Sequence, residues 1–276
     1  MGQDLVDRLD WAKQDSWIAV FDILGFKNII RETNDDTKRI YLILRLNDLL
    51  KELKIDELAS KGIEHLIISD TIILFSITYG FLLSLCKKLI ERSIYIELPL
   101  RGALSYGATF RNPKYPTILI GPAFVEAYEY CEGQDWIGFL LTPSATKAVR
   151  NDGLEPLHHH FVSDELPLKN DKLSPVDVVA YRFQGGSSNF DSPLLAKLKQ
   201  MQFLAPVNAK SKYTNTIQFI ERYYQKQQKR LIVSHITISR LFITFFPATR
   251  STDNEYNSKK CHYSHYHYKN ISKPSS

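Results

Sequence analysis

Two short apolar segments of the chain each carry one aspartate, and this pattern constrains the fold more than any other. The first segment, SWIAVF, leads into Asp22, and the second, HLIISDTIILF, carries Asp70 at its centre. Apolar runs of this kind, rich in β-branched and aromatic residues, predict buried strands. Two carboxylates beside apolar strands would repel each other and be costly to desolvate unless a cation pairs with them. The sequence therefore predicts that Asp22 and Asp70 share a metal site.

The other segments alternate between helical and strand patterns. Two apolar arms flank Ser69 and Asp70, which predicts a β-hairpin with Asp70 in its turn. Apolar residues at helical spacing, among them Ile40, Ile43 and Leu44, predict an amphipathic helix after the first strand. We expect helices at 28–54, 80–92, 123–130 and 143–150, and further strands at 94–107, 137–141 and 176–183. The order β-α-β-β-α-β with additions predicts an α+β fold with a ferredoxin-like core.

The length of 276 residues indicates one principal domain and an appendage, because single cores seldom grow past about 250 residues. We expect an N-terminal extension at 1–15, the core domain at 16–185, a C-terminal helical appendage at 190–230 and an irregular tail at 231–276. The composition of the tail changes abruptly, so we hypothesise a frameshift or degenerate sequence, which resequencing across the codon for Arg230 would test. The alternative, a membrane anchor at 231–247, is disfavoured by His235 and Arg240 near its middle.

Cysteine usage and charge exclude several classes of protein. Three cysteines, Cys86, Cys131 and Cys261, show no CxxC spacing, so neither a disulfide framework nor a zinc ribbon is indicated. The opening residues lack the pattern of a secretory signal, and we expect a cytoplasmic protein. The net charge of +5 forms no dense basic stripe, so we expect no nucleic-acid partner. The run His158–His160 is not expected to bind metal, because three adjacent histidines cannot all face one ion.

Five segments of the chain resemble, in order, those of the class III nucleotidyl cyclases. They are FDILGF, SDTIILF, LRGALSYG, IGPAFVEAY and GFLLTPSATKAV, and the resemblance spans about Trp17 to Phe183. FDILGF and SDTIILF are similar to the two metal-binding segments of the family, with Ser69 where glycine is usual. LPLKN, at Leu166 to Asn170, resembles the lysine-containing strand. The fold that the resemblance implies is the class III catalytic core.

The resemblance implies that a nucleoside triphosphate is converted to a 3′,5′-cyclic nucleotide with release of pyrophosphate. Two divalent ions, Mg²⁺ or Mn²⁺, would be held by Asp22, Asp70 and the backbone carbonyl of Ile23. Arg101, Lys147 and Lys169 are candidate phosphate ligands, with Lys169 preferred. The chain carries one cyclase-like unit, so activity would require a homodimer. The alternative for the aspartates is structural: Asp22 could cap the following helix and Asp70 could simply form a turn.

Departures from the family pattern leave the substrate open. Leu66 and Ile118 stand at the base-recognition positions, where neither can hydrogen-bond a purine edge. The chain therefore resembles the pyrimidine cyclases of bacterial antiphage defence, and Tyr106 could stack on a base. Val125 and Glu129 replace the family's transition-state asparagine and arginine. They favour the alternative of a catalytically inactive domain that binds a nucleotide or partner as a sensor.

Overall fold

The computed structural model describes residues 12–32, 36–112, 114–152, 161–163, 166–169, 173–183 and 192–245, with the backbone alone at residues 32, 116–117 and 227–245. His158–His160 and the tail beyond Phe245 lie outside the described residues. By its internal contacts, the chain divides into two compact units, and the boundary in the sequence falls between Arg230 and Leu231. The fold and site below belong to the first unit.

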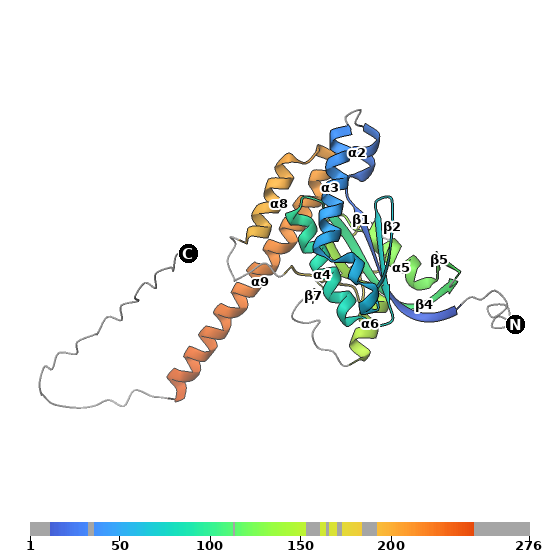
Figure 1. Ribbon diagram of the computed structural model, residues 1–276. Helices are drawn as coiled ribbons and strands as arrows, with labels where there is room; N and C mark the ends of the chain where they lie inside the picture. Colours follow the sequence, from blue (N-terminus) through green and yellow to red (C-terminus); the bar gives the residue numbers. More distant parts are fainter. Residues whose placement is uncertain are drawn as a thin grey trace, which may run out of the picture. The chain divides into compact units, whose positions relative to one another are not determined.

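Strands and helices alternate along the described chain (Figure 1). The strands are β1 (Ala12–Ile23), β2 (Glu64–Ile68), β3 (Thr71–Ser76), β4 (Leu100–Asn112), β5 (Tyr115–Ile120), β6 (Gly138–Leu141), β7 (Phe161–Val162) and β8 (Val179–Tyr181). The helices are α2 (Phe26–Glu32), α3 (Asp36–Glu52), α4 (Gly80–Tyr95), α5 (Pro122–Glu132), α6 (Pro143–Asn151), α8 (Pro193–Leu204) and α9 (Val207–Phe245). Two short 3₁₀ helices, Ile55–Glu57 and Ala59–Lys61, precede β2.

One mixed sheet forms the centre of the fold, in the order β2-β3-β1-β4-β6-β8-β7, with β5 paired to β4. All pairs among the first four strands, β1 to β4, are antiparallel. The pairing of β4 with β6 is parallel. Strand β1 therefore lies between β3 and β4, and its C-terminal end, with Asp22, is enclosed on both sides.

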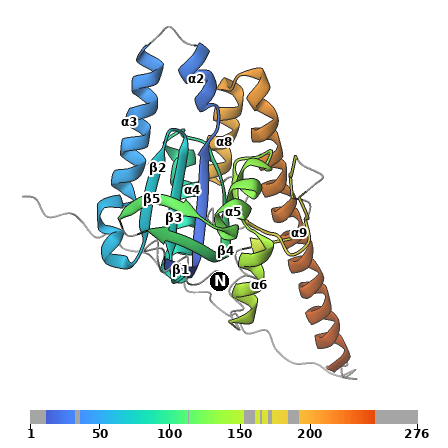
Figure 2. The same ribbon diagram turned by 90° about the vertical axis from the view of Figure 1, so that its right-hand side faces the viewer.

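Helices cover both faces of this sheet. In both views α4 lies on one side of the strands and α5 on the other (Figures 1 and 2). Phe21 of β1 stacks on Phe139 of β6 at a ring separation of 5.5 Å, and both side chains are fully buried. Continuous apolar burial along β1 explains why SWIAVF carries no alternating polar residues: a central strand covered on both faces is apolar throughout.

Several predicted elements are confirmed, and others differ in their bounds. The hairpin with Ser69 and Asp70 in its turn is present, because Ile68 pairs with Thr71. The single helix expected at 28–54 is instead two helices, α2 and α3. The strand expected at 94–107 begins only at Leu100, since its first residues continue α4. Strands β5 and β7 were not predicted, because each is short and one of them contains a proline.

Only part of the apolar face that sequence spacing marked on α3 packs on the core. Leu46 and Leu50 pack against the core, whereas Ile40, Ile43 and Leu44 each keep half or more of their surface in solvent. Two leucines of the helix that the spacing did not single out are also buried. Helical periodicity identifies apolar positions and does not say which of two apolar stripes faces the sheet.

Helices α8 and α9 pack on the core through buried apolar side chains and through specific polar contacts. Glu97, in the loop before β4, forms ion pairs with Arg45 of α3 at 2.5 Å and with Lys197 of α8 at 2.6 Å. In α9, the hydroxyl of Thr216 accepts the backbone N–H of Ile137 at 2.8 Å. The first turns of α9 lie toward the α2 end of the sheet in both views (Figures 1 and 2). No helix among the described residues is long and apolar enough to cross a membrane.

Candidate active site

The ends of β1 and the β2–β3 hairpin bring the two predicted aspartates together. Asp22 pairs with Thr71 in the antiparallel ladder, so the hairpin turn lies directly beside it. The backbone N–H of Ile23 donates to the carbonyl of Asp70 at 2.9 Å, which fixes the turn against β1. Ser69 has a φ of 57°, in the left-handed region that favours glycine. The turn is therefore slightly strained at Ser69 and is held in place by the main chain.

A cavity of about 310 Å³ opens at this end of the sheet. Five predicted site residues line it: Asp22, Ile23, Asp70, Arg101 and Lys169. The turn after β1 and the first residues of α2 line it as well. Residues from six separate parts of the chain thus meet at one cavity, a proximity that the sequence pattern alone does not predict.

Arg101 binds Asp22 directly across the sheet. The two residues are register partners in the β1–β4 ladder, and Arg101 Nη2 lies 2.6 Å from Asp22 Oδ2. Its Nε also donates to Oδ2 at 2.9 Å, and its Nη1 donates to the carbonyls of Glu132 and Gln134 at 2.8 and 3.1 Å. All three guanidinium nitrogens are therefore engaged within the chain. In this structure Arg101, predicted as a phosphate ligand, orients Asp22 and holds the C-terminal end of α5.

The charge state of Asp22 reflects competing influences. Burial raises the pKa of its carboxyl above the ordinary value of 3.8, and the neighbouring Asp70 carboxylate raises it further. The Arg101 guanidinium opposes both effects without cancelling them. The ionised pair of carboxylates thus lacks full compensation by groups of the protein, and an additional cation would stabilise it.

Lys169 lies at the same cavity, on the loop that precedes β8. Its ammonium group donates to the carbonyl of Glu132 at 3.2 Å. Burial lowers the pKa of Lys169, and repulsion from Arg101 and from Lys212 lowers it further. Lys212 belongs to α9 and also lines the cavity, as does Lys27 at the start of α2. Sequence analysis missed both of these lysines, because a single lysine beside a recognised segment or on a predicted helix gives no sign of which cavity it lines.

The predicted base-recognition residues lie outside this cavity. Leu66 is half-buried on β2, and Ile118 is exposed on β5. Tyr106 packs on Trp17 at a ring separation of 4.6 Å. Trp17 is five residues before Asp22 on the same strand, a distance of about 17 Å at 3.3 Å per residue.

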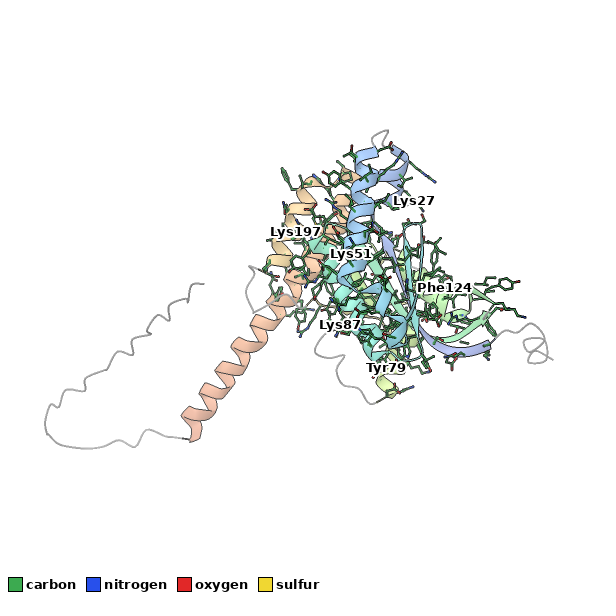
Figure 3. The ribbon with its side chains drawn as sticks, viewed as in Figure 1. Lys27, Lys51, Tyr79, Lys87, Phe124 and Lys197 are labelled. Atoms are coloured by element: carbon green, nitrogen blue, oxygen red, sulfur yellow. The ribbon has the colours of Figure 1, made fainter. Side chains whose placement is uncertain are left out.

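Tyr106 belongs to a second cavity of about 590 Å³, lined in part by Trp17 and Tyr79. In Figure 3 Lys27 and Tyr79 are labelled at opposite ends of the core, which shows the separation of the two cavities. Lys147 lies on α6 with an exposed side chain and lines neither cavity. Val125 and Glu129 are exposed on α5, and they do not line the cavity with Asp22.

The donor set of the site suits a hard divalent cation. Asp22 and Asp70 offer carboxylate oxygens, and Mg²⁺ is commonly held by one or two carboxylates together with substrate phosphates and water. Among the described residues there is no group of three or more His, Cys, Asp or Glu arranged to hold a metal. The two aspartates therefore fit an ion that the substrate helps to coordinate, rather than a closed structural metal site.

Several solved protein structures are similar to this chain. No protein-family model matches the chain, and no curated protein sequence matches it significantly. The adenylyl cyclase CyaB from P. aeruginosa is 14% identical with a TM-score of 0.45, over 63% of this chain and 96% of that one.

Two further cyclase structures are similar at the same level. The guanylate cyclase domain of RhGC from Catenaria anguillulae, in complex with GTP, is 13% identical with a TM-score of 0.42, over 62% of this chain and 97% of that one. The catalytic core of a rhodopsin-guanylyl cyclase with converted specificity, in complex with ATPalphaS, is 14% identical with a TM-score of 0.41, over 51% and 84%. All of these TM-scores are below 0.5, and the likeness by itself assigns no function to the chain.

Proposed function

We propose that this protein is a metal-dependent nucleotidyl cyclase of class III type. It would convert a nucleoside triphosphate to a 3′,5′-cyclic nucleotide and pyrophosphate. The observation that carries the proposal is the meeting of Asp22 and Asp70, from two separate apolar segments, at one cavity that Arg101 and Lys169 also line. A sheet alone would not require two neighbouring carboxylates there.

The strand arrangement supports the same proposal. Strands β2, β3, β1 and β4 are neighbours in that order, and every pair is antiparallel. With α3 between β1 and β2 and α4 between β3 and β4, this is the arrangement expected of a ferredoxin-like βαββαβ core. We interpret residues 16–185 as that core with additions, and α8 with the first part of α9 as the helical appendage.

The chain's own residues would hold and orient the reacting groups. Asp22, Asp70 and the carbonyl of Ile23 would hold two divalent ions, Mg²⁺ or Mn²⁺. When bound, these ions would supply activation of the ribose 3′-hydroxyl and neutralisation of the leaving pyrophosphate. Arg101 fixes the orientation of Asp22 through Oδ2, and the second carboxylate oxygen, Oδ1, takes no part in this ion pair. Lys169 would place a positive charge beside the phosphates.

The residues at the base-recognition positions support a pyrimidine nucleotide as substrate. Leu66 and Ile118 carry no polar group, and a pocket that leaves the polar edge of a purine unpaired binds it poorly. A signalling role in antiviral defence, and a cytoplasmic location where nucleoside triphosphates are available, belong to the same proposal. Tyr106 is included as a residue that could contact the base.

The separation of the two groups of residues supports a homodimer. Leu66, Tyr106 and Ile118 do not line the cavity with Asp22, so a second copy of the chain would have to bring them to the phosphates. Exposed apolar side chains on β5 and α5 are available for such an interface: Tyr115, Ile118, Ile120, Val125 and Tyr128. Light scattering at tens of micromolar protein should give a dimer, and a fully active monomer would contradict this part of the proposal.

One observation favours an inactive domain as a second candidate. Val125 and Glu129 stand where the resembled family carries the groups that stabilise the transition state, and glutamate has the wrong charge for that role. Such a domain would bind a nucleotide and report it to a partner without turning it over. Binding with full occupancy and no product would identify it.

The test is to incubate the full chain with ATP, GTP, CTP and UTP in turn, with Mn²⁺, and to identify products by mass. We expect a cyclic nucleotide from one of them, most readily from CTP or UTP. Asp70→Asn should abolish the product, because it removes a metal ligand. Asp48→Asn, an exposed position on α3, is the matched control and should retain activity. Product from none of the four, with folded protein, would refute the proposal.

A further inference from the structure

Helix α9 contributes directly to the cavity that holds Asp22 and Asp70. Asn208, Ala209, Lys212 and Tyr213 line it from the first two turns of the helix. Packing fixes this part of α9, since Tyr213 is 8% exposed and Asn215 Nδ2 donates to the carbonyl of Asp135 at 2.7 Å. The helix is therefore a wall of the site.

Positive charge accumulates on this side of the cavity. Arg101, Lys169 and Lys212 come from β4, the loop before β8, and α9, three elements far apart in sequence. Arg101 is neutralised by Asp22, whereas the Lys169 ammonium donates a hydrogen bond to the neutral carbonyl of Glu132. The repulsion that lowers the pKa of Lys169 comes from Arg101 and Lys212, which shows that the three charges lie within range of one another.

Lys212 is placed to interact with a ligand as well as with the protein. Its Nζ lies 3.6 Å from Asp135 Oδ1, and its side chain is 21% exposed. This ion pair is looser than the 2.6 Å contact between Arg101 and Asp22, and an ammonium group has three donors. Asp135 also accepts from Asn215. Asp135 thus positions the lysine and leaves it donors for a further acceptor.

We propose that Lys212 binds the terminal phosphates of the substrate, so that α9 forms part of the active site. This inference rests on the proposed function, because it assigns the ligand as the polyphosphate of a nucleoside triphosphate and of the pyrophosphate that leaves. A polyanion would relieve the repulsion between Lys169 and Lys212, and each charge-assisted hydrogen bond would be short and strong. The alternative is a structural role, in which Lys212 only forms the ion pair with Asp135.

The experiment measures binding of inorganic tripolyphosphate to the full chain by calorimetry, in metal-depleted buffer at fixed ionic strength. Lys212→Met removes the charge and keeps an unbranched side chain of similar length. Lys210→Ala is the matched control, because Lys210 lies two residues away on the same helix, is exposed and does not line the cavity. Lys212→Arg tests whether a different cationic side chain at this position restores binding. Far-ultraviolet circular dichroism confirms that each variant is folded.

We expect Lys212→Met to weaken tripolyphosphate binding about tenfold or more, the loss expected for one hydrogen bond to a charged group. Lys210→Ala should bind as the wild type does, and Lys212→Arg should recover most of the affinity. Equal binding by Lys212→Met and wild type, an equal loss in Lys210→Ala, or no binding by the wild type would each overturn the inference.

The result of this binding experiment can be distinguished from the result of the cyclase assay. A chain that makes cyclic nucleotide but binds tripolyphosphate equally well without Lys212 would keep the cyclase proposal and overturn this one. A chain that makes no cyclic product but needs Lys212 to bind tripolyphosphate would do the reverse: the phosphate site would stand and the cyclase activity would not.

Discussion

Asp70→Asn should stabilise the metal-free protein, although most substitutions in a functional site destabilise. Asp70 lies in the hairpin turn beside Asp22, and its negative charge raises the pKa of the Asp22 carboxyl. Asparagine has the same shape and suits a turn, and the carbonyl of residue 70 would still accept from Ile23. The substitution therefore removes repulsion and leaves the main-chain contacts unchanged.

The size of the effect follows from the environment of the two carboxylates. Two unit charges about 5 Å apart repel by about 1 kcal/mol in water and about 3 kcal/mol at an effective dielectric constant of about 20. Asp22 keeps 19% of its side chain exposed and is paired with Arg101, so solvent and the guanidinium both screen the repulsion. We expect Asp70→Asn to raise the free energy of unfolding by about 1 kcal/mol, or the Tm by about 2–4 °C.

The assay is thermal unfolding at pH 7 after removal of divalent ions, repeated with Mn²⁺. Wild-type protein should be stabilised by Mn²⁺, because an ion that binds only the folded state adds its binding free energy. Asp70→Asn should be more stable than wild type without metal and gain much less from Mn²⁺. A metal-free Asp70→Asn protein that is less stable than both wild type and the Asp48→Asn control would refute this account of the site.

Three further predictions concern Asp22, its partner Arg101 and the close packing of the chain at Gly121. Burial keeps the pKa of Asp22 above 3.8, so the folded metal-free protein binds the proton more tightly than the unfolded chain. Its stability relative to Asp22→Asn should be greatest below pH 3.8 and fall as the pH rises through the folded-state pKa, which denaturant unfolding at several pH values would show; an unchanged difference would contradict this. Arg101→Gln should cost about 3–5 kcal/mol at pH 7, because it leaves a largely buried carboxylate unpaired, and less below pH 3.8, where the raised pKa of Asp22 favours its neutral form; an equal cost at both pH values would argue against the ion pair as the cause. Gly121→Ala should cost about 3 kcal/mol or more, since the new Cβ would lie 2.4 Å from the backbone oxygen of Ala108, whereas Gly80→Ala, with open space around it, should cost at most about 1 kcal/mol.

Local sequence patterns were sufficient to predict the part of the site that depends on neighbouring residues. The hairpin around Asp70 follows from two apolar arms joined by two polar residues. The strand before Asp22 follows from its unbroken run of β-branched and aromatic residues. Each aspartate is placed by the segment that contains it, so a single sequence is enough to locate both.

Contacts between distant segments could not be predicted in this way. Arg101 meets Asp22 because β1 and β4 pair in one particular register, and a shift of one residue would turn Arg101 to the other face. Lys212 reaches the cavity because α9 docks on residues 135–137, where Phe219 packs on Trp136 at a ring separation of 4.6 Å and polar side chains of the helix bind the main chain. Helical periodicity predicts the apolar face of α9 but does not say which part of the core that face packs on. The exposed Ile40 and Ile43 show the same limit for helix α3.

The most direct test of the cyclase proposal is to measure cyclic nucleotide and pyrophosphate together, in one reaction of the full chain with Mn²⁺ and the preferred triphosphate. The proposed chemistry predicts one pyrophosphate for each cyclic nucleotide, with both lost in Asp70→Asn and kept in Asp48→Asn. Release of inorganic phosphate without a cyclic product, or activity that survives in Asp70→Asn, would contradict it.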